Sequence, residues 1–188
     1  PWACMLLDPR SHVQDFVENP HKKVRYFVSS MVHPTTLDGL RKSNVALWGY
    51  HAHVGAGEDD VLRERLGEKT FMIGGGCSSA MRGISVLHCI GFRKFKLYGY
   101  DLNYPLTNGE VPKEWDGQLD GNGNPKYMEV EVMGKKFWTD AEKVAQAQDF
   151  IKMMDQVNDI RLETFGPGIV PHVWNSKRKM LPQFSDIF

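Results

Sequence analysis

The stretch from Phe71 to Asp101 constrains the fold of this chain most. An apolar run ends at Gly74-Gly75-Gly76, a helical pattern follows from Ser79 to Ile90, and a second apolar run leads to Asp101. This order predicts strand, turn, helix and parallel strand, which is one βαβ unit. Open α/β sheets bind their ligands at the carboxyl ends of such strands, so the stretch also predicts where a ligand would lie.

The glycine turn has the composition of a phosphate-binding loop. Glycine lets the backbone turn sharply and lets a ligand approach its amides. A serine after the turn can cap the helix, whose unpaired N–H groups favour an anion, and an arginine one turn later can grip two phosphate oxygens. The predicted cofactor-binding residues here are Gly74, Gly75, Gly76, Ser78, Ser79 and Arg82. A purely structural turn is the alternative, because the glycines match neither the dinucleotide fingerprint nor the P-loop.

Strand and helix patterns alternate along the rest of the chain. Apolar runs predict strands over residues 2–7, 26–28, 45–50 and 161–165, and helical periodicity is strongest from Asp140 to Asp159. The alternation predicts an α/β, Rossmann-like fold with a mostly parallel sheet and helices on both faces. Alternating residues from Met128 to Thr139 predict a late β-hairpin insertion. We expect one domain over residues 1–174 and a C-terminal tail over 175–188.

Composition narrows the classes of partner. The chain has 23 Lys+Arg and 23 Asp+Glu, so no global charge favours nucleic acid. No apolar run approaches the length of a membrane span. The three cysteines lack the spacing of a zinc site or a disulfide framework, which favours a reducing cytoplasm. We therefore expect neither nucleic acid nor a membrane as a partner. The glycine turn indicates a nucleotide, together with a small-molecule acceptor, and the sequence leaves open whether the chain forms a homo-oligomer.

Two aspartates end predicted strands. Asp101 follows an apolar run, where an ionised carboxylate needs a cation, hydrogen bonds or solvent. Mg²⁺ beside a substrate phosphate meets that need, and capping of the following loop is the alternative. Asp8 could hydrogen-bond a ribose or form an ordinary Asp-Pro-Arg turn. We expect the glycine turn and Asp101 to lie side by side at one rim of the sheet.

The glycine turn, together with Gly91 to Tyr104, resembles the core of the 6-hydroxymethylpterin diphosphokinase MptE-like family. Gly134 to Asp140 and Gly166 to Ile169 are similar to later segments of that family, so the resemblance covers about residues 71–174. Its most specific element, Gly99-Tyr100-Asp101-Leu102-Asn103-Tyr104, adds Asn103 and Tyr104 to the predicted cofactor site. The resemblance implies a Rossmann-like fold and Mg²⁺-dependent transfer of diphosphate from ATP to a small alcohol.

A more distant resemblance is to bacterial sialyltransferases that use a CMP-sugar donor. It implies an alternative, a glycosyltransferase in which His172 serves as general base. The MptE-like family usually begins with a strand and a Gly-Pro-Ser-type phosphate loop that this sequence does not show, so we expect the chain to start inside a domain. The prediction is a nucleotide-dependent transferase with Asp101 and His172 as catalytic residues, and a non-catalytic binding domain is the third alternative.

Overall fold

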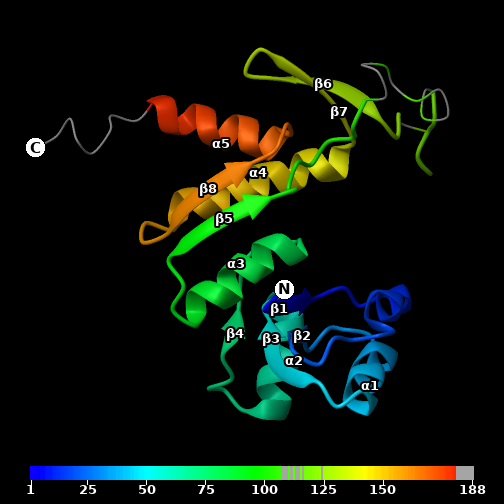
Figure 1. The fold of residues 1–188 in the computed structure, drawn as a ribbon, viewed down its shortest axis with the longest axis vertical. Helices are drawn as coiled ribbons and strands as arrows, with labels where there is room; N and C mark the ends of the chain where they lie inside the picture. Colours follow the sequence, from blue (N-terminus) through cyan, green and yellow to red (C-terminus); the bar gives the residue numbers. More distant parts are fainter. Residues whose placement is uncertain (107–109, 111, 113–114, 116, 124, 181–188) are drawn as a thin grey trace, which may run out of the picture. The chain divides into compact units, whose positions relative to one another are not determined.

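The computed structural model describes residues 1–106, 110, 112, 115, 117–123 and 125–180. The chain divides into two compact units, Pro1–Gly91 and Phe92–Phe188, each described below by itself (Figure 1). That residues 1–174 form a single domain stays a prediction. No helix in the described ranges is long and apolar enough to cross a membrane.

Unit 1 is built around a four-stranded parallel sheet in the order β1-β2-β3-β4 (Figure 1). Because all four strands run in the same direction, their carboxyl ends meet at one edge of the sheet. The elements of unit 1 are β1 (Ala3–Leu6), the 3-10 helix η1 (Ser11–Val17), β2 (Arg25–Ser29), α1 (Pro34–Lys42), β3 (Ala46–Ala52), α2 (Ala56–Leu66), β4 (Met72–Ile73) and α3 (Ser79–Cys89). The predicted α/β, Rossmann-like fold is confirmed.

Helices cover both faces of this sheet. On one face, Leu6 and Val28 belong to a buried cluster with Val13 of η1 and Leu40 of α1. On the other face, Phe27 packs in a second cluster that includes Val86 of α3. Successive side chains of a strand point to opposite faces, so burial on both faces explains why the strands are continuous apolar runs.

Unit 2 contains a parallel strand pair and an antiparallel hairpin. Its elements are β5 (Lys94–Tyr98), β6 (Met128–Val132), β7 (Lys135–Thr139), α4 (Ala141–Gln156), β8 (Arg161–Phe165) and α5 (Ile169–Met180). β5 pairs with β8 in parallel, and β6 pairs with β7 across Met133-Gly134, whose φ angles of 50° and 76° are both positive. The predicted hairpin and the strand at 161–165 are confirmed. Asp140 caps α4 as expected, accepting a hydrogen bond from the Lys143 backbone N–H at 2.7 Å.

The structure differs from the sequence prediction at the C-terminal end. α5 runs from Ile169 to Met180, so the predicted tail is helical over its first six residues, 175–180. Pro171 makes this helix difficult to predict from the sequence, because proline usually breaks helices. In the structure Pro171 lies in the first turn, where a backbone N–H has no intrahelical acceptor, so proline costs no hydrogen bond there. The rest of the predicted tail, residues 181–188, lies outside the described residues. So do residues 107–109, 111, 113–114, 116 and 124.

Candidate functional site

The glycine turn after β4 is at the carboxyl edge of the unit 1 sheet. Gly75 and Gly76 have φ angles of 125° and 72°, and a Cβ at these positions would overlap the side chains of Ser85 and Met81, both in α3. Close packing on α3 therefore requires these two glycines. Gly74 differs, because it is exposed and a Cβ there would meet nothing within 4 Å. Of the three predicted glycines, Gly74 leaves room for a ligand.

The two predicted serines lie at the N-terminus of α3. The Ser78 hydroxyl caps the helix by accepting a hydrogen bond from the Met81 backbone N–H at 3.3 Å. Ser79, the first residue of the helix, is exposed. Ser78 therefore has the capping role that the sequence predicts, and the N-terminus of α3 is at the sheet edge where an anion is favoured.

Arg82 is buried under the turn, with 6% of its surface exposed. Its guanidinium donates to the carbonyl of Ile73, to that of His53 at 3.1 Å and to that of Gly76 at 2.9 Å. In the described part of the chain all its hydrogen-bond partners are backbone carbonyls, and its Nε is buried without a partner. Burial lowers the pKa of Arg82, although arginine stays protonated at neutral pH. Arg82 thus ties the ends of β3 and β4 to the turn and places an unneutralised charge beneath it.

A histidine and an aspartate next to this turn form a pair that sequence analysis missed. His53 follows β3, and its Nδ1 is hydrogen-bonded to the carboxylate of Asp59 in the first turn of α2. The side chain of His53 is 53% exposed and that of Asp59 is 4% exposed. In the sequence Asp59 belongs to an acidic run, Glu58-Asp59-Asp60, which is typical of a solvated helix surface. In the structure α2 begins at Ala56, and this start places Asp59 in the first turn, next to the end of β3.

A hollow of about 480 Å³ lies on the α1 face of the sheet, over the carboxyl halves of β2 and β3. Its floor includes Gly49, where a Cβ would meet nothing within 4 Å. Arg41 and His51 contribute polar atoms, and the His51 Nδ1 is buried with no hydrogen-bond partner among the described residues. The hollow has the size of a small-molecule pocket.

In unit 2, Asp101 holds the turn that precedes α5. Its carboxylate accepts a hydrogen bond from the Gly168 backbone N–H at 3.0 Å, and its carbonyl accepts one from Ile169 at 2.8 Å. A Cβ at Gly166 or Gly168 would overlap Asp101. The structure therefore gives Asp101 the role of holding the turn before α5, which is not the loop directly after Asp101 that the alternative to metal binding named.

His172 lies next to the same turn. Its Nε2 is 3.1 Å from the Val132 carbonyl, so Nε2 carries a proton and Nδ1 is the proton acceptor of the neutral ring. With Lys135, Gly166 and Gly168, His172 lines a polar hollow of about 210 Å³. The structure thus brings the two predicted catalytic residues, Asp101 and His172, to the same turn.

Tyr104 belongs to a hydrogen-bonded cluster with Asp140 and Lys143. Its hydroxyl donates to Asp140 and accepts from Lys143 Nζ at 2.6 Å. Burial, together with the hydrogen bond to Asp140, raises the pKa of Tyr104. Burial alone would raise the pKa of Asp140, but the hydrogen bonds from Lys143 and Tyr104 outweigh it and lower that pKa. Asn103 donates to the Tyr104 carbonyl at 3.2 Å, and its Oδ1 is buried with no described partner.

Asp8 is engaged by its neighbour in the turn after β1. Arg10 Nε donates to both carboxylate oxygens, at 2.9 and 3.0 Å, and the Arg10 backbone N–H donates at 2.9 Å. These hydrogen bonds hold the pKa of Asp8 at about 2. The geometry is that of the Asp-Pro-Arg turn, the alternative to ribose binding.

The described residues contain no group of three His, Cys, Asp or Glu side chains placed to hold a metal ion. Mg²⁺ commonly takes one or two carboxylates and completes its shell with phosphate oxygens and water. A single carboxylate such as that of Asp101 is compatible with a Mg²⁺ site of this kind, and not with a site that needs several protein ligands.

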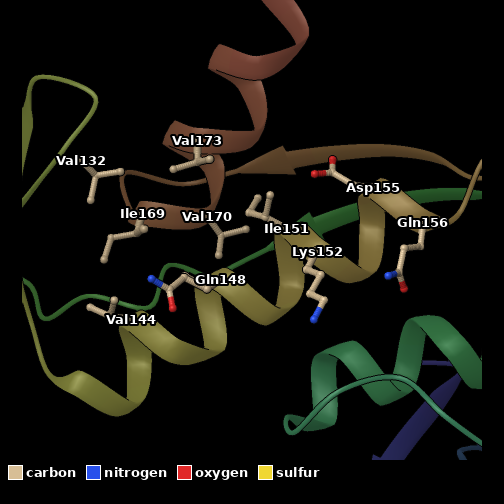
Figure 2. A pocket seen from close by; sticks show the side chains of 11 residues that line it. Val132, Val144, Gln148, Ile151, Lys152, Asp155, Gln156, Ile169, Val170 and Val173 are labelled. Atoms are coloured by element: carbon tan, nitrogen blue, oxygen red, sulfur yellow. The ribbon is translucent and has the colours of Figure 1, made fainter.

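A further hollow in unit 2, of about 530 Å³, is predominantly aliphatic (Figure 2). Figure 2 shows Val144 and Ile151 of α4 near Ile169, Val170 and Val173 of α5. Such a lining disfavours phosphate, because it offers few partners for the charged oxygens. The polar edge of the unit 1 sheet is the better candidate for an anion site.

Comparisons with protein-family models, curated proteins and solved structures find no match to this chain.

Proposed function

We propose that this protein is a nucleotide-dependent transferase that binds the phosphates of its nucleotide at the carboxyl edge of the unit 1 sheet. One observation carries the proposal: the open Gly74 and the N-terminus of α3 lie beside the buried Arg82, whose charge no described carboxylate neutralises. A helix N-terminus and a buried guanidinium both favour an anion.

In the preferred version the nucleotide is ATP with Mg²⁺, and diphosphate is transferred to a small hydroxylated acceptor. Bound Mg²⁺ would neutralise phosphate charge, which is the main requirement of phosphoryl transfer. Asp101 is the residue that would hold the ion, through the carboxylate that also accepts from Gly168.

A CMP-sugar-dependent glycosyltransferase is the second candidate. The hollow beside His172 favours it, because about 210 Å³ is a size suited to a small polar group such as a sugar. The His172 Nδ1 is the nitrogen able to accept a proton from an acceptor hydroxyl, since Nε2 is bound to Val132. This candidate predicts preference for cytidine nucleotides.

Titration calorimetry with ATP, CTP and CMP, with and without Mg²⁺, tests the proposal. Gly74→Val is the informative variant, because its side chain enters open space in the turn and would displace a phosphate. We expect it to weaken nucleotide binding at least about 10-fold, a difference of about 1.4 kcal/mol. Gly83→Ala is the matched control, since a Cβ at Gly83 in α3 also meets nothing within 4 Å.

The outcomes separate the candidates. Tighter binding of ATP with Mg²⁺ supports the diphosphokinase-like enzyme, and tighter binding of CMP or CTP supports the glycosyltransferase. No binding of any nucleotide by the wild-type chain contradicts both and leaves the non-catalytic binding domain.

A further inference from the structure

We propose that His53 is the general base of unit 1 and that Asp59 is its positioning residue. The inference deepens the proposed function and rests on it: His53 would take the proton from the acceptor hydroxyl while the nucleotide is held at the adjacent turn. A histidine placed by a buried carboxylate is a recurrent arrangement for this purpose.

The backbone fixes the imidazole beside the glycine turn. His53 follows β3, and its N–H donates to the carbonyl of Ile73, the last residue of β4, at 3.0 Å. Its own carbonyl accepts from Arg82, which also donates to the Gly76 carbonyl at 2.9 Å. One guanidinium thus links the histidine to the turn at which we place the phosphates.

The carboxylate of Asp59 fixes the orientation of the ring. One oxygen is bonded to the His53 Nδ1, and the other accepts from the Val54 backbone N–H at 3.3 Å. Burial alone would raise the pKa of Asp59, but the hydrogen bonds from His53 and Val54 outweigh it and lower that pKa. Asp59 is therefore ionised at neutral pH, and an ionised carboxylate accepts only, so Nδ1 carries the proton.

The exposed part of the ring then carries the free lone pair. In the neutral imidazole with a proton on Nδ1, Nε2 is the acceptor. The His53 side chain is 53% exposed, whereas the Asp59 side chain that holds Nδ1 is 4% exposed, so the solvent-facing side is that of Nε2. In the described ranges the His53 Nε2 has no hydrogen-bond partner, and the nitrogen is open to a substrate hydroxyl.

In the proposed step, diphosphate passes from ATP to the acceptor hydroxyl. The acceptor oxygen forms a bond to the β-phosphorus of ATP, and the bond between that phosphorus and the oxygen of AMP breaks, with its electron pair leaving on AMP. The acceptor proton moves to the His53 Nε2 and then to solvent. Asp59 stabilises the imidazolium that forms and does not itself take the proton.

A purely structural role for the pair makes different predictions. If Asp59 only secured the loop between β3 and α2, its removal would lower the free energy of unfolding. The tautomer of the His53 imidazole would then have no effect on turnover. The turnover of bound nucleotide, measured with ATP affinity unchanged, is the readout that a structural role would not move. The tautomer of His53 tests the geometry on which the general base depends.

The first experiment is long-range ¹H–¹⁵N NMR of protein labelled at histidine, at a pH where imidazoles are neutral. We expect His53 to have its proton on Nδ1 in the wild type and to shift toward the Nε2-protonated tautomer in Asp59→Asn. This measurement needs no ligand. A wild-type His53 with its proton on Nε2 would overturn the inference.

The second experiment measures AMP release from Mg²⁺ and ATP, with water in the place of the acceptor alcohol. We expect His53→Gln to lower kcat about 100-fold or more and Asp59→Asn about 10-fold or more, with ATP affinity within about twofold of wild type. His12→Gln, in η1 of the same unit, is the histidine control and should leave kcat unchanged.

The two proposals fail in different ways. Absence of ATP binding by the wild-type chain contradicts the proposed function, and with it the transfer step. Normal ATP binding with no AMP release, or with release unaffected by His53→Gln, contradicts the general base alone.

Discussion

Both units place a glycine-containing turn and a helix directly after a parallel strand, yet they use the polar groups at these turns differently. In unit 1 the turn after β4 packs on its own helix, while His53 and Gly74 stay exposed. In unit 2 the turn after β8 is held by Asp101, which lies three residues after the end of the neighbouring strand β5. A carboxylate at a strand end is therefore weak evidence for a metal site, because holding the turn can be its role.

We expect the largest effect from Arg82→Met, a variant at the carboxyl edge of the unit 1 sheet. The variant removes three hydrogen bonds that tie β3, β4 and the glycine turn together. We expect the free energy of unfolding, measured with urea, to fall by about 3 kcal/mol, because charged hydrogen bonds are lost and buried carbonyls lose their donors.

Arg41→Met is the control for Arg82→Met, since Arg41 is exposed and should change stability by less than about 0.5 kcal/mol. Equal stability of the two variants would contradict the view that Arg82 holds the sheet edge together.

Asp101→Asn tests whether the unit 2 carboxylate does more than hold its turn. The amide oxygen can still accept from Gly168, so the free energy of unfolding should change by less than about 1 kcal/mol. If Asp101 holds Mg²⁺, Mg²⁺-dependent turnover should fall about 100-fold, as expected when an electrostatic stabiliser of the reaction is lost. Unchanged turnover would mean that the role of Asp101 is to hold the turn before α5 and not to bind Mg²⁺.

The smallest expected effect is on acid stability. The pKa of folded Asp59 lies below its ordinary value of 3.8, so the residue adds stability above that pH, and this is lost as the pH falls through the folded-state pKa. Unfolding measured from pH 6 to pH 2 should therefore depend less steeply on pH in Asp59→Asn than in wild type. Identical slopes would contradict an ionised Asp59 bound to His53.

The sequence predicted those parts of the fold that depend on local pattern. Continuous apolar runs indicated the parallel strands, and alternation around Met133-Gly134 indicated the hairpin. The cap of α4 by Asp140 was also predictable, because an N-cap depends on residues within one turn.

The contacts at the candidate site were not predictable in the same way. Arg82 bonds to the His53 carbonyl 29 residues away, and Asp101 bonds to the Gly168 N–H 67 residues away. Asp59 is buried only because α2 begins at Ala56 and turns it back toward His53. Such pairings depend on how whole elements pack, which local periodicity does not encode.

The glycine turn and Asp101 belong to different compact units, so their expected proximity stays a prediction. Phosphate binding by the glycine turn of unit 1 does not require that proximity.

NMR of the backbone amides during titration with ATP and Mg²⁺ tests this phosphate binding most directly. We predict the largest shift changes at Gly74 and Ser79, where the turn meets the N-terminus of α3, and their loss in Gly74→Val. Binding that leaves these amides unmoved and shifts others instead would contradict the account.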